Sequence, residues 1–178
     1  MESRISIIVP VYNAASTLER CVRALMGQTY RNIEIILVND GSTDKSGDIC
    51  TSYSQKYPEK IFSFHKENEG QFLARKYGIL KCTGDYVGFL DADDLLDDNY
   101  VKTISESVAE YNSPDVLCFG FARFGDSMKK EYKLTDRTTF FKTQDGSFQT
   151  IWHINAAKLP VFGRKQENAD ISHREKRV

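Results

Sequence analysis

Short apolar runs alternate with helical segments along the first 125 residues, and this alternation limits the fold more than any other feature. Runs rich in branched and aromatic side chains predict strands at residues 5–10, 33–40, 61–66, 85–90 and 115–124. Between these runs, apolar side chains at helical spacing predict helices over about 16–27, 46–57, 70–84 and 98–111. Alternation of this kind builds βαβ units, so we predict an α/β fold with a mostly parallel sheet flanked by helices.

Local patterns refine two of these helices. Ser16 and Glu19 have the spacing of a capping box, which predicts the start of the first helix, and Gly27 predicts its end. In the third helix, the spacing of Leu73, Tyr77 and Leu80 predicts that these three side chains face the core.

The size and charge of the chain exclude several classes of protein. Its 178 residues are enough for one domain with a substantial core. The 24 basic and 25 acidic residues give a net charge of −1, which provides no basic surface for nucleic acid. No signal peptide is visible, and no apolar run approaches the ~18 residues of a membrane span. We therefore expect a cytoplasmic protein without a transmembrane segment.

Four cysteines are spread along the chain without metal-binding or redox spacing. They are Cys21, Cys50, Cys82 and Cys118, and no pair has the CxxC spacing of zinc ligands. We predict free thiols, mostly buried as small apolar side chains, in a reducing compartment.

Polar and acidic residues follow four of the predicted strands. In open α/β sheets, ligands bind beyond the carboxyl ends of the strands, so we expect these residues to share one site. Asp91 and Asp93 follow the strand at 85–90, and residues i and i+2 of an extended segment face the same way. Two such carboxylates repel each other unless a cation lies between them, which predicts Mg²⁺ or Mn²⁺ holding a diphosphate.

The other aspartates of this stretch have a simpler interpretation. Asp97 and Asp98 lie at the start of the helix at 98–111 and suit capping of its first turn, which we favour for both. Capping explains Asp91 and Asp93 poorly, because they precede the helix by more than a turn. The role of Asp94 stays open.

Three further residues have both a structural and a ligand-binding interpretation. Asp40 lies in a turn after a strand, where its carboxylate could also accept the N–H of a nucleobase. Tyr12 could pack in the interior or stack on a base. Arg75 could be a solvated side chain or a cation near the diphosphate. The glycine patterns of dinucleotide and P-loop sites are absent from the sequence.

Two long stretches together resemble the family 2 glycosyltransferases of the GT-A fold. They read SIIVPVYNAASTLERCVRALMGQTYRNIEIILVNDGSTDKS and NEGQFLARKYGILKCTGDYVGFLDADD, and the match covers roughly residues 4–124. The resemblance implies a GT-A, Rossmann-like fold in which residues 1–125 form a nucleotide-sugar-binding core. It also implies an inverting transfer of a sugar from a nucleotide sugar, usually UDP-linked, to an acceptor hydroxyl, with Mn²⁺ or Mg²⁺ as cofactor.

The resemblance assigns a nucleobase site. Pro10, Tyr12 and Asn13 match the stretch that frames the base in this family. Asp40 matches the aspartate that bonds the uracil ring. The resemblance therefore favours the ligand-binding interpretation of Asp40.

The resemblance also assigns the neighbourhood of the phosphates. Asn68, Gly70 and Arg75 match a stretch that lies beside the nucleotide. Asp91 and Asp93 match the DxD motif, with Asp91 toward the ribose and phosphate and Asp93 toward the metal.

Residues 126–178 are expected to form an incomplete acceptor-side segment of the same domain. We predict a hairpin at the sheet edge, a short helix at 149–160 and a frayed tail from about residue 163. The catalytic base of the family lies late in the chain in a Glu-Asp pair, and no such pair follows Asp93 here. Glu167 and Asp170 are the remaining candidates for the base.

The resemblance thus implies addition of single sugars during the biosynthesis of cell-surface polysaccharide or glycolipid. The acceptor would be a carbohydrate or a lipid-linked molecule, which leaves peripheral attachment at the inner face of the cell membrane open. Two alternatives also stay open. One is a nucleotide-sugar binding module without a catalytic base, and the other is an interaction domain whose acidic residues only cap helices.

Overall fold

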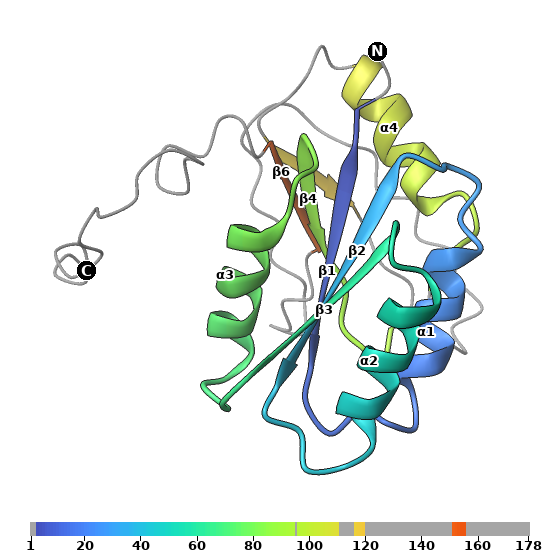
Figure 1. Ribbon diagram of the computed structural model, residues 1–178. Coiled ribbons are helices and arrows are strands. Elements are labelled where there is room, and N and C mark those ends of the chain that lie inside the picture. Colours follow the sequence, from blue (N-terminus) through green and yellow to red (C-terminus); the bar gives the residue numbers. More distant parts are fainter. Residues whose placement is uncertain (1–2, 95, 111–115, 120–150, 156–178) are drawn as a thin grey trace, which may run out of the picture.

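The chain folds around one sheet, as seen in a computed structural model that describes residues 3–94, 96–110, 116–119 and 151–155 (Figure 1). The elements in chain order are β1 (Ile5–Val11), α1 (Leu18–Met26), β2 (Ile33–Asp40), α2 (Ser46–Lys56), β3 (Ile61–Lys66), α3 (Gln71–Lys81), β4 (Tyr86–Phe89), α4 (Tyr100–Glu110), β5 (Val116–Phe119) and β6 (Ile151–Asn155). The described strands lie in the order β3-β2-β1-β4-β6-β5.

The first part of this sheet is parallel. β1 pairs in parallel with β2 and with β4, and β2 pairs in parallel with β3. Each crossover between these strands contains a helix, as parallel pairing requires. The predicted α/β fold with a mostly parallel sheet is therefore confirmed.

The prediction of a short helix at 149–160 is wrong for residues 151–155. These residues form β6, which runs antiparallel to both β4 and β5. A short apolar run can be buried as a strand or as a helix, and its own pattern does not decide between them. Here the backbone groups of β4 and β5 provide pairing partners, so position in the sheet decides. The predicted hairpin between residues 126 and 148 and the predicted frayed tail lie outside the described residues.

Helices cover both faces of the sheet, with α3 on one face and α1, α2 and α4 on the other (Figure 1). Alternate residues of β1 and β2 point to opposite faces, which divides the apolar interior into two clusters. The larger cluster contains Ile7 and Ile35 and packs against α1, α2 and α4, whereas the smaller contains Ile8 and Ile36 and packs against α3. Burial on both faces explains why these strands are apolar almost throughout.

Small residues bring α3 close to the sheet. Ala74 and Gly78 are its buried residues, and a Cβ atom at Gly78 would lie 2.5 Å from Cγ2 of Ile8. The prediction that Leu80 faces the core is wrong, since Leu80 is 57% exposed. Apolar spacing alone missed this orientation, because the helix faces the sheet with its smallest residues rather than its largest.

The predicted capping box at the start of α1 is also wrong. The helix begins at Leu18 with Thr17 as its N-cap, and no side chain caps it. Glu19 instead forms an ion pair with Arg23 one turn further along. The predicted end is confirmed, because Gly27 is the C-cap of α1.

At the amino edge of the sheet, where β1, β2 and β4 begin, a buried carboxylate ties the strands together. Glu34 accepts hydrogen bonds from the Ser6 hydroxyl, from the Thr83 hydroxyl and N–H, and from the Gly84 N–H, and it pairs with Arg4 at 3.0 Å. Burial by itself would raise the pKa of Glu34, but these partners outweigh burial and hold the pKa below its usual value.

The prediction of buried thiols is confirmed for three of the four cysteines. Cys21, Cys50 and Cys82 are buried, and none of these three forms a disulfide. Burial, reinforced for Cys21 by nearby carboxylates, raises the pKa of Cys21 and of Cys50 to about 12. Among the described helices, none has the length and apolar character needed to cross a membrane.

Candidate nucleotide and metal site

A pocket with a volume of about 680 Å³ lies at the carboxyl edge of the sheet, where β1, β2, β3 and β4 end. It is lined by Pro10, Val11, Tyr12, Asn13, Ala14, Ser16, Thr17, Asp40, Asn68, Gly70, Gln71, Asp91, Ala92 and Asp93. The fold thus brings together residues that are as far as 83 positions apart in the sequence (10 to 93).

Nearly all the residues that the sequence singled out for a nucleotide or a metal line this pocket. Those that line it are Pro10, Tyr12, Asn13, Asp40, Asn68, Gly70, Asp91 and Asp93. Arg75 does not line the pocket itself but forms an ion pair with Asp91 at 2.5 Å. The structure therefore places the predicted site residues together, while their individual roles stay predictions.

The loops that follow β1 and β2 are joined by Asn13. Its side-chain oxygen accepts hydrogen bonds from the N–H and the hydroxyl of Thr43, and its N–H donates to the Ser42 hydroxyl at 3.0 Å. Asn13 has a φ of 48°, a left-handed conformation that asparagine tolerates better than most residues. Its side chain therefore shapes the wall of the pocket through contacts with Thr43.

Tyr12 lies beside Asn13 and extends into solvent. Its side chain is 52% exposed although it is large and apolar. The alternative in which Tyr12 packs in the interior is therefore wrong. An exposed ring in the wall of a pocket is available to stack on a flat ligand.

Asp40, the last residue of β2, holds the loop that follows β3. Its Oδ1 accepts hydrogen bonds from Nζ of Lys66 at 2.6 Å and from the N–H of Glu69, and its Oδ2 accepts one from the N–H of Gly70 at 2.8 Å. Burial alone would raise the pKa of Asp40, but the hydrogen bonds from Lys66 and the two N–H groups keep it below its usual value. Asp40 is therefore a carboxylate at neutral pH.

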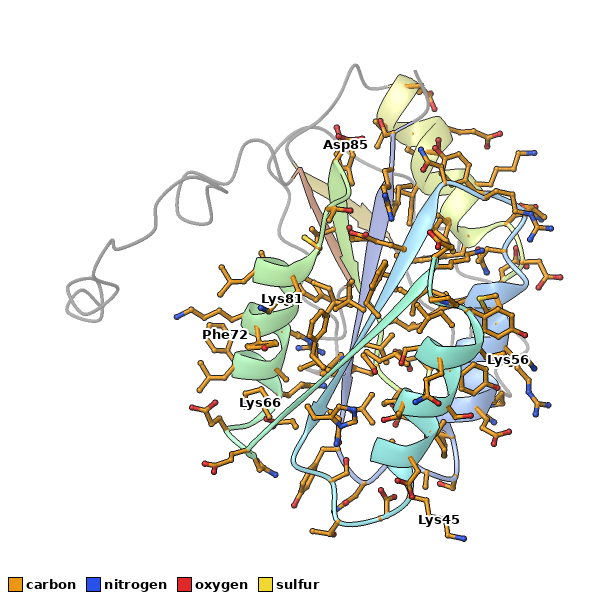
Figure 2. All side chains as sticks on the ribbon, in the orientation of Figure 1. Lys45, Lys56, Lys66, Phe72, Lys81 and Asp85 are labelled. Atoms are coloured by element: carbon orange, nitrogen blue, oxygen red, sulfur yellow. The ribbon has the colours of Figure 1, made fainter. Side chains whose placement is uncertain are left out.

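Sequence reasoning missed Lys66, which is the cationic partner of Asp40. A signal was present, since Lys66 ends one predicted strand and Asp40 ends another. In the parallel register of β2 and β3, these two residues are direct partners. Figure 2 shows Lys66 at the carboxyl edge and Asp85 at the opposite end of the sheet.

Asp91 is already engaged by two side chains of α3. Its Oδ1 accepts hydrogen bonds from the Arg75 guanidinium at 2.5 Å and from Nε2 of Gln71 at 2.9 Å. The Arg75 guanidinium also lies 5.9 Å from the centre of the Phe89 ring, a cation–π distance. Arg75 is therefore not a solvated arginine, and Gln71 is a further contact that the sequence pattern did not reveal.

Asp93 differs from Asp91 in the surroundings of its carboxylate. It is exposed, and the described residues supply its side chain with no hydrogen-bond donor. Its backbone carbonyl accepts a hydrogen bond from Arg20 at 3.2 Å, which links the loop to α1. Burial and the charges of Asp91 and Asp93 raise the pKa of Asp94, so these three aspartates repel one another.

The carboxylates at this edge suit a hard cation whose other ligands come from a phosphate group. The part of the chain that the structure describes contains no group of three or more His, Cys, Asp or Glu side chains able to hold a metal. Asp91 and Asp93 provide two carboxylates, and Mg²⁺ in proteins commonly uses one or two carboxylates together with phosphates and water. The two residues therefore fit a metal that arrives with a diphosphate.

Residues 97–101, at the start of α4, are held by two side chains that follow α1 and by a local turn. Asp97 accepts a hydrogen bond from the Asn99 N–H, which forms a local turn before α4 begins at Tyr100. The capping role of Asp97 and Asp98 stays a prediction. The buried Gln28 donates to the Asp97 carbonyl and accepts from the Val101 N–H, and Thr29 donates to the Asp98 carbonyl. The candidate bases Glu167 and Asp170 lie outside the described residues.

The sequence as a whole matches a known family over residues 6–166, and that family is Glycosyl transferase family 2. The chain belongs to this family. Membership confirms the resemblance that the motifs suggested.

Curated relatives agree with this family assignment. Glycosyltransferase GlyA of Streptococcus pneumoniae is 39% identical over 127 residues, which cover 71% of this chain and 18% of GlyA. Minor teichoic acid biosynthesis protein GgaB of Bacillus subtilis is 36% identical over 135 residues, which cover 74% of this chain and 15% of GgaB. The family 2 chain therefore spans less than a fifth of the length of either relative.

Solved structures support the fold. Residues 1–349 of Staphylococcus aureus TarS superpose with a TM-score of 0.68 at 21% identity, covering 86% of this chain and 47% of that one. A mannosyltransferase from Pyrobaculum calidifontis, solved with GDP-Man and Mn²⁺, superposes with a TM-score of 0.59 at 23% identity and covers 70% and 36%. The family 2 chain thus has the GT-A fold.

Proposed function

We propose that this chain is the nucleotide-sugar-binding part of an inverting glycosyltransferase that uses a UDP-linked donor. The observation that carries the proposal is the pocket at the carboxyl edge, which collects the base-framing residues, Asp40 and the two DxD aspartates. TarS has also been solved in complex with UDP-GlcNAc, which supports a uridine donor. The division into a core at 1–125 and an acceptor-side segment at 126–178 is part of the proposal.

Each part of the pocket would contact a different part of the donor. Tyr12 would stack on the base, and such stacking contributes about 1–3 kcal/mol. Asp40 would accept the N–H of a uracil ring, while Pro10, Asn13, Asn68 and Gly70 shape the surrounding wall. Asp91 would contact the ribose and phosphate, with Arg75 close by to balance the charge.

Asp91 and Asp93 would hold Mn²⁺ or Mg²⁺ together with the diphosphate. The cation supplies Lewis-acid stabilisation of the charge that develops on the leaving diphosphate. Inversion needs a base on the opposite side of the sugar to take the proton of the acceptor hydroxyl, and we propose Glu167 or Asp170 for this role. GgaB is named for teichoic acid biosynthesis, which supports a cell-surface polysaccharide or glycolipid as the product.

Calorimetry with UDP and Mn²⁺ tests the donor site. We expect UDP binding that strengthens in the presence of Mn²⁺, and we expect Asp93→Ala to abolish this strengthening because it removes a ligand without disturbing a hydrogen bond. Asp98→Ala is a matched control, since Asp98 is an exposed aspartate of the same loop that does not line the pocket. Equal UDP binding by wild type and Asp93→Ala with Mn²⁺ would reject the metal site.

A second candidate function is donor binding without transfer. It is favoured by the sequence after Asp93, which contains no Glu-Asp pair. This candidate predicts UDP binding with no release of UDP from any UDP-sugar. Release of UDP that disappears in Glu167→Gln or Asp170→Asn, with UDP binding unchanged, would reject it in favour of the enzyme.

A further inference from the structure

We infer that Lys66 is a positioning residue for base recognition, because it fixes the Asp40 carboxylate so that a single acceptor position is left for the ligand. The inference rests on the proposed function and adds to it a reason why the pocket selects uracil. The sequence places Lys66 at the end of a predicted strand, but only the structure pairs it with Asp40.

The first step concerns the ammonium group of Lys66, which is fully used. An ammonium has three N–H donors. Those of Lys66 have three acceptors within reach: Oδ1 of Asp40 at 2.6 Å, the Glu67 carbonyl at 2.6 Å and Oε2 of Glu69 at 2.7 Å. The Lys66 side chain is only 12% exposed, so this arrangement is held in place rather than exchanged with water. Lys66 therefore positions Asp40 and does not itself contact the ligand.

The second step concerns the acceptor capacity of Asp40. A carboxylate has about four acceptor positions. Lys66 and the N–H of Glu69 use two positions on Oδ1, and the N–H of Gly70 uses one on Oδ2. Among the described residues no further donor reaches Asp40, so one acceptor position on Oδ2 is left, and Asp40 lines the pocket.

The third step matches this single acceptor to the nucleobases. Uracil presents one ring N–H, at N3, between two carbonyl groups. Guanine presents two neighbouring donors, at N1 and N2, and would leave one of them without a partner when buried. Cytosine and adenine place a ring nitrogen lone pair next to the amino group, which a carboxylate repels. A buried polar group left without a partner is costly, so the arrangement selects uracil.

The test is a double cycle that pairs a change in the protein with a change in the ligand, measured by calorimetry on the full chain with Mn²⁺. The ligands are UDP, N3-methyl-UDP, in which the base has lost its N–H, and GDP. In the wild type we expect methylation to weaken binding by about tenfold or more, the effect of a lost hydrogen bond to a charged group. In Lys66→Met the same methylation should weaken binding by less than about threefold, because Asp40 is no longer fixed.

Matched controls separate base recognition from stability. Lys102→Met also removes a lysine that pairs with a glutamate, 3.7 Å away, but lies in α4 outside the pocket, so its methylation penalty should equal that of the wild type. If the role of Lys66 were purely structural, Lys66→Met would weaken the binding of UDP and of N3-methyl-UDP by the same factor. Should Lys66→Met not fold, Lys66→Arg takes its place. Its planar guanidinium cannot reproduce three divergent donors, so the penalty should fall by at least about threefold.

Each result has a distinct meaning. An unchanged methylation penalty in the Lys66 variant overturns the inference and leaves the proposed function standing. Tighter wild-type binding of GDP than of UDP also overturns the inference, and it leaves a glycosyltransferase with a different donor. Absence of binding of any of the three nucleotides by the wild type overturns both.

Discussion

Glu34 and Asp40 lie at the two ends of β2 and make an instructive pair. Both carboxylates are almost fully buried, with residue exposures of 1% and 2%, and both have a pKa below the usual value. Glu34 at the amino edge accepts hydrogen bonds from Ser6, Thr83 and Gly84 and pairs with Arg4. Asp40 at the carboxyl edge accepts from Lys66 and two N–H groups and lines a pocket.

The difference lies in what surrounds each carboxylate rather than in its burial or charge. A Cβ atom at Gly84 would lie 2.4 Å from the Ser6 hydroxyl, so the chain is tightly packed beside Glu34, which is 1% exposed. The space in front of Asp40 is open, because the chain turns away from the sheet after each parallel strand ends. Glu34 is therefore expected to act on stability alone, and Asp40 on stability and binding together.

The largest expected effect is the loss of stability in Glu34→Ala. Removing this carboxylate takes away the acceptor of the Ser6 and Thr83 hydroxyls and the ion-pair partner of Arg4, which should lower the free energy of unfolding by about 3–5 kcal/mol. Chemical denaturation measures this change, with Glu106→Ala, an exposed glutamate of α4, as the control. A decrease in the free energy of unfolding of less than about 1 kcal/mol would show that Glu34 does not have the predicted structural role.

Asp40→Asn should change binding in a way that no variant at the amino edge does. Loss of the charge should weaken UDP binding by about 1.5–3 kcal/mol, the contribution of a hydrogen bond to a charged group. Glu34→Gln should bind UDP as the wild type does, once affinity is expressed per folded molecule. Calorimetry with UDP on both variants checks this. Equal losses of affinity would show that Asp40 has no role in binding beyond that of Glu34.

A pair of tyrosines extends the comparison to aromatic residues. Tyr12 is exposed at the carboxyl edge, whereas Tyr30 is buried and donates its hydroxyl to the Ser3 carbonyl at 2.6 Å, before β1 begins. Tyr12→Ala should weaken UDP binding by about 1–3 kcal/mol without lowering the melting temperature. Tyr30→Phe should do the reverse, lowering stability by about 1 kcal/mol with UDP binding intact. Melting curves and calorimetry on both variants test these opposite effects on stability and UDP binding.

The smallest effect is on the acid limb of the stability curve. Since both pKa values are lower in the folded state, each carboxylate adds stability that is complete above its unfolded pKa of about 4 and is lost as pH falls through the folded pKa. One such group contributes at most about 1.4 kcal/mol per pH unit in that window. Glu34→Gln should therefore flatten the loss of stability as the pH falls below about 4. A slope equal to that of the wild type would count against a lowered pKa at Glu34.

Much of the fold followed from the sequence, because local periodicity specifies local elements. The strands at 33–40 and 61–66 are predicted with the bounds that the structure shows. The acidic residues at the strand ends could be placed at one edge in advance, since parallel strands all end on the same side. The same reasoning gave Asp40, Asp91 and Asp93 as members of one pocket.

Periodicity could not predict features that depend on contacts between residues distant in the sequence. Residues 151–155 form a strand because β4 and β5 offer them partners. Leu80 is exposed because α3 approaches Ile8 through Gly78, a contact that apolar spacing does not reveal. In each case the deciding interaction joins segments far apart in the chain.

By itself, the sequence determined which residues end the strands and which of these carry charge, since both follow from the local order of residues. Only the tertiary structure decided how each charge is used. The parallel register puts Lys66 beside Asp40, and the packing of α3 puts Arg75 beside Asp91. The physical reason is that the state and role of a carboxylate depend on the donors within about 3 Å of it, and these come from other strands and helices.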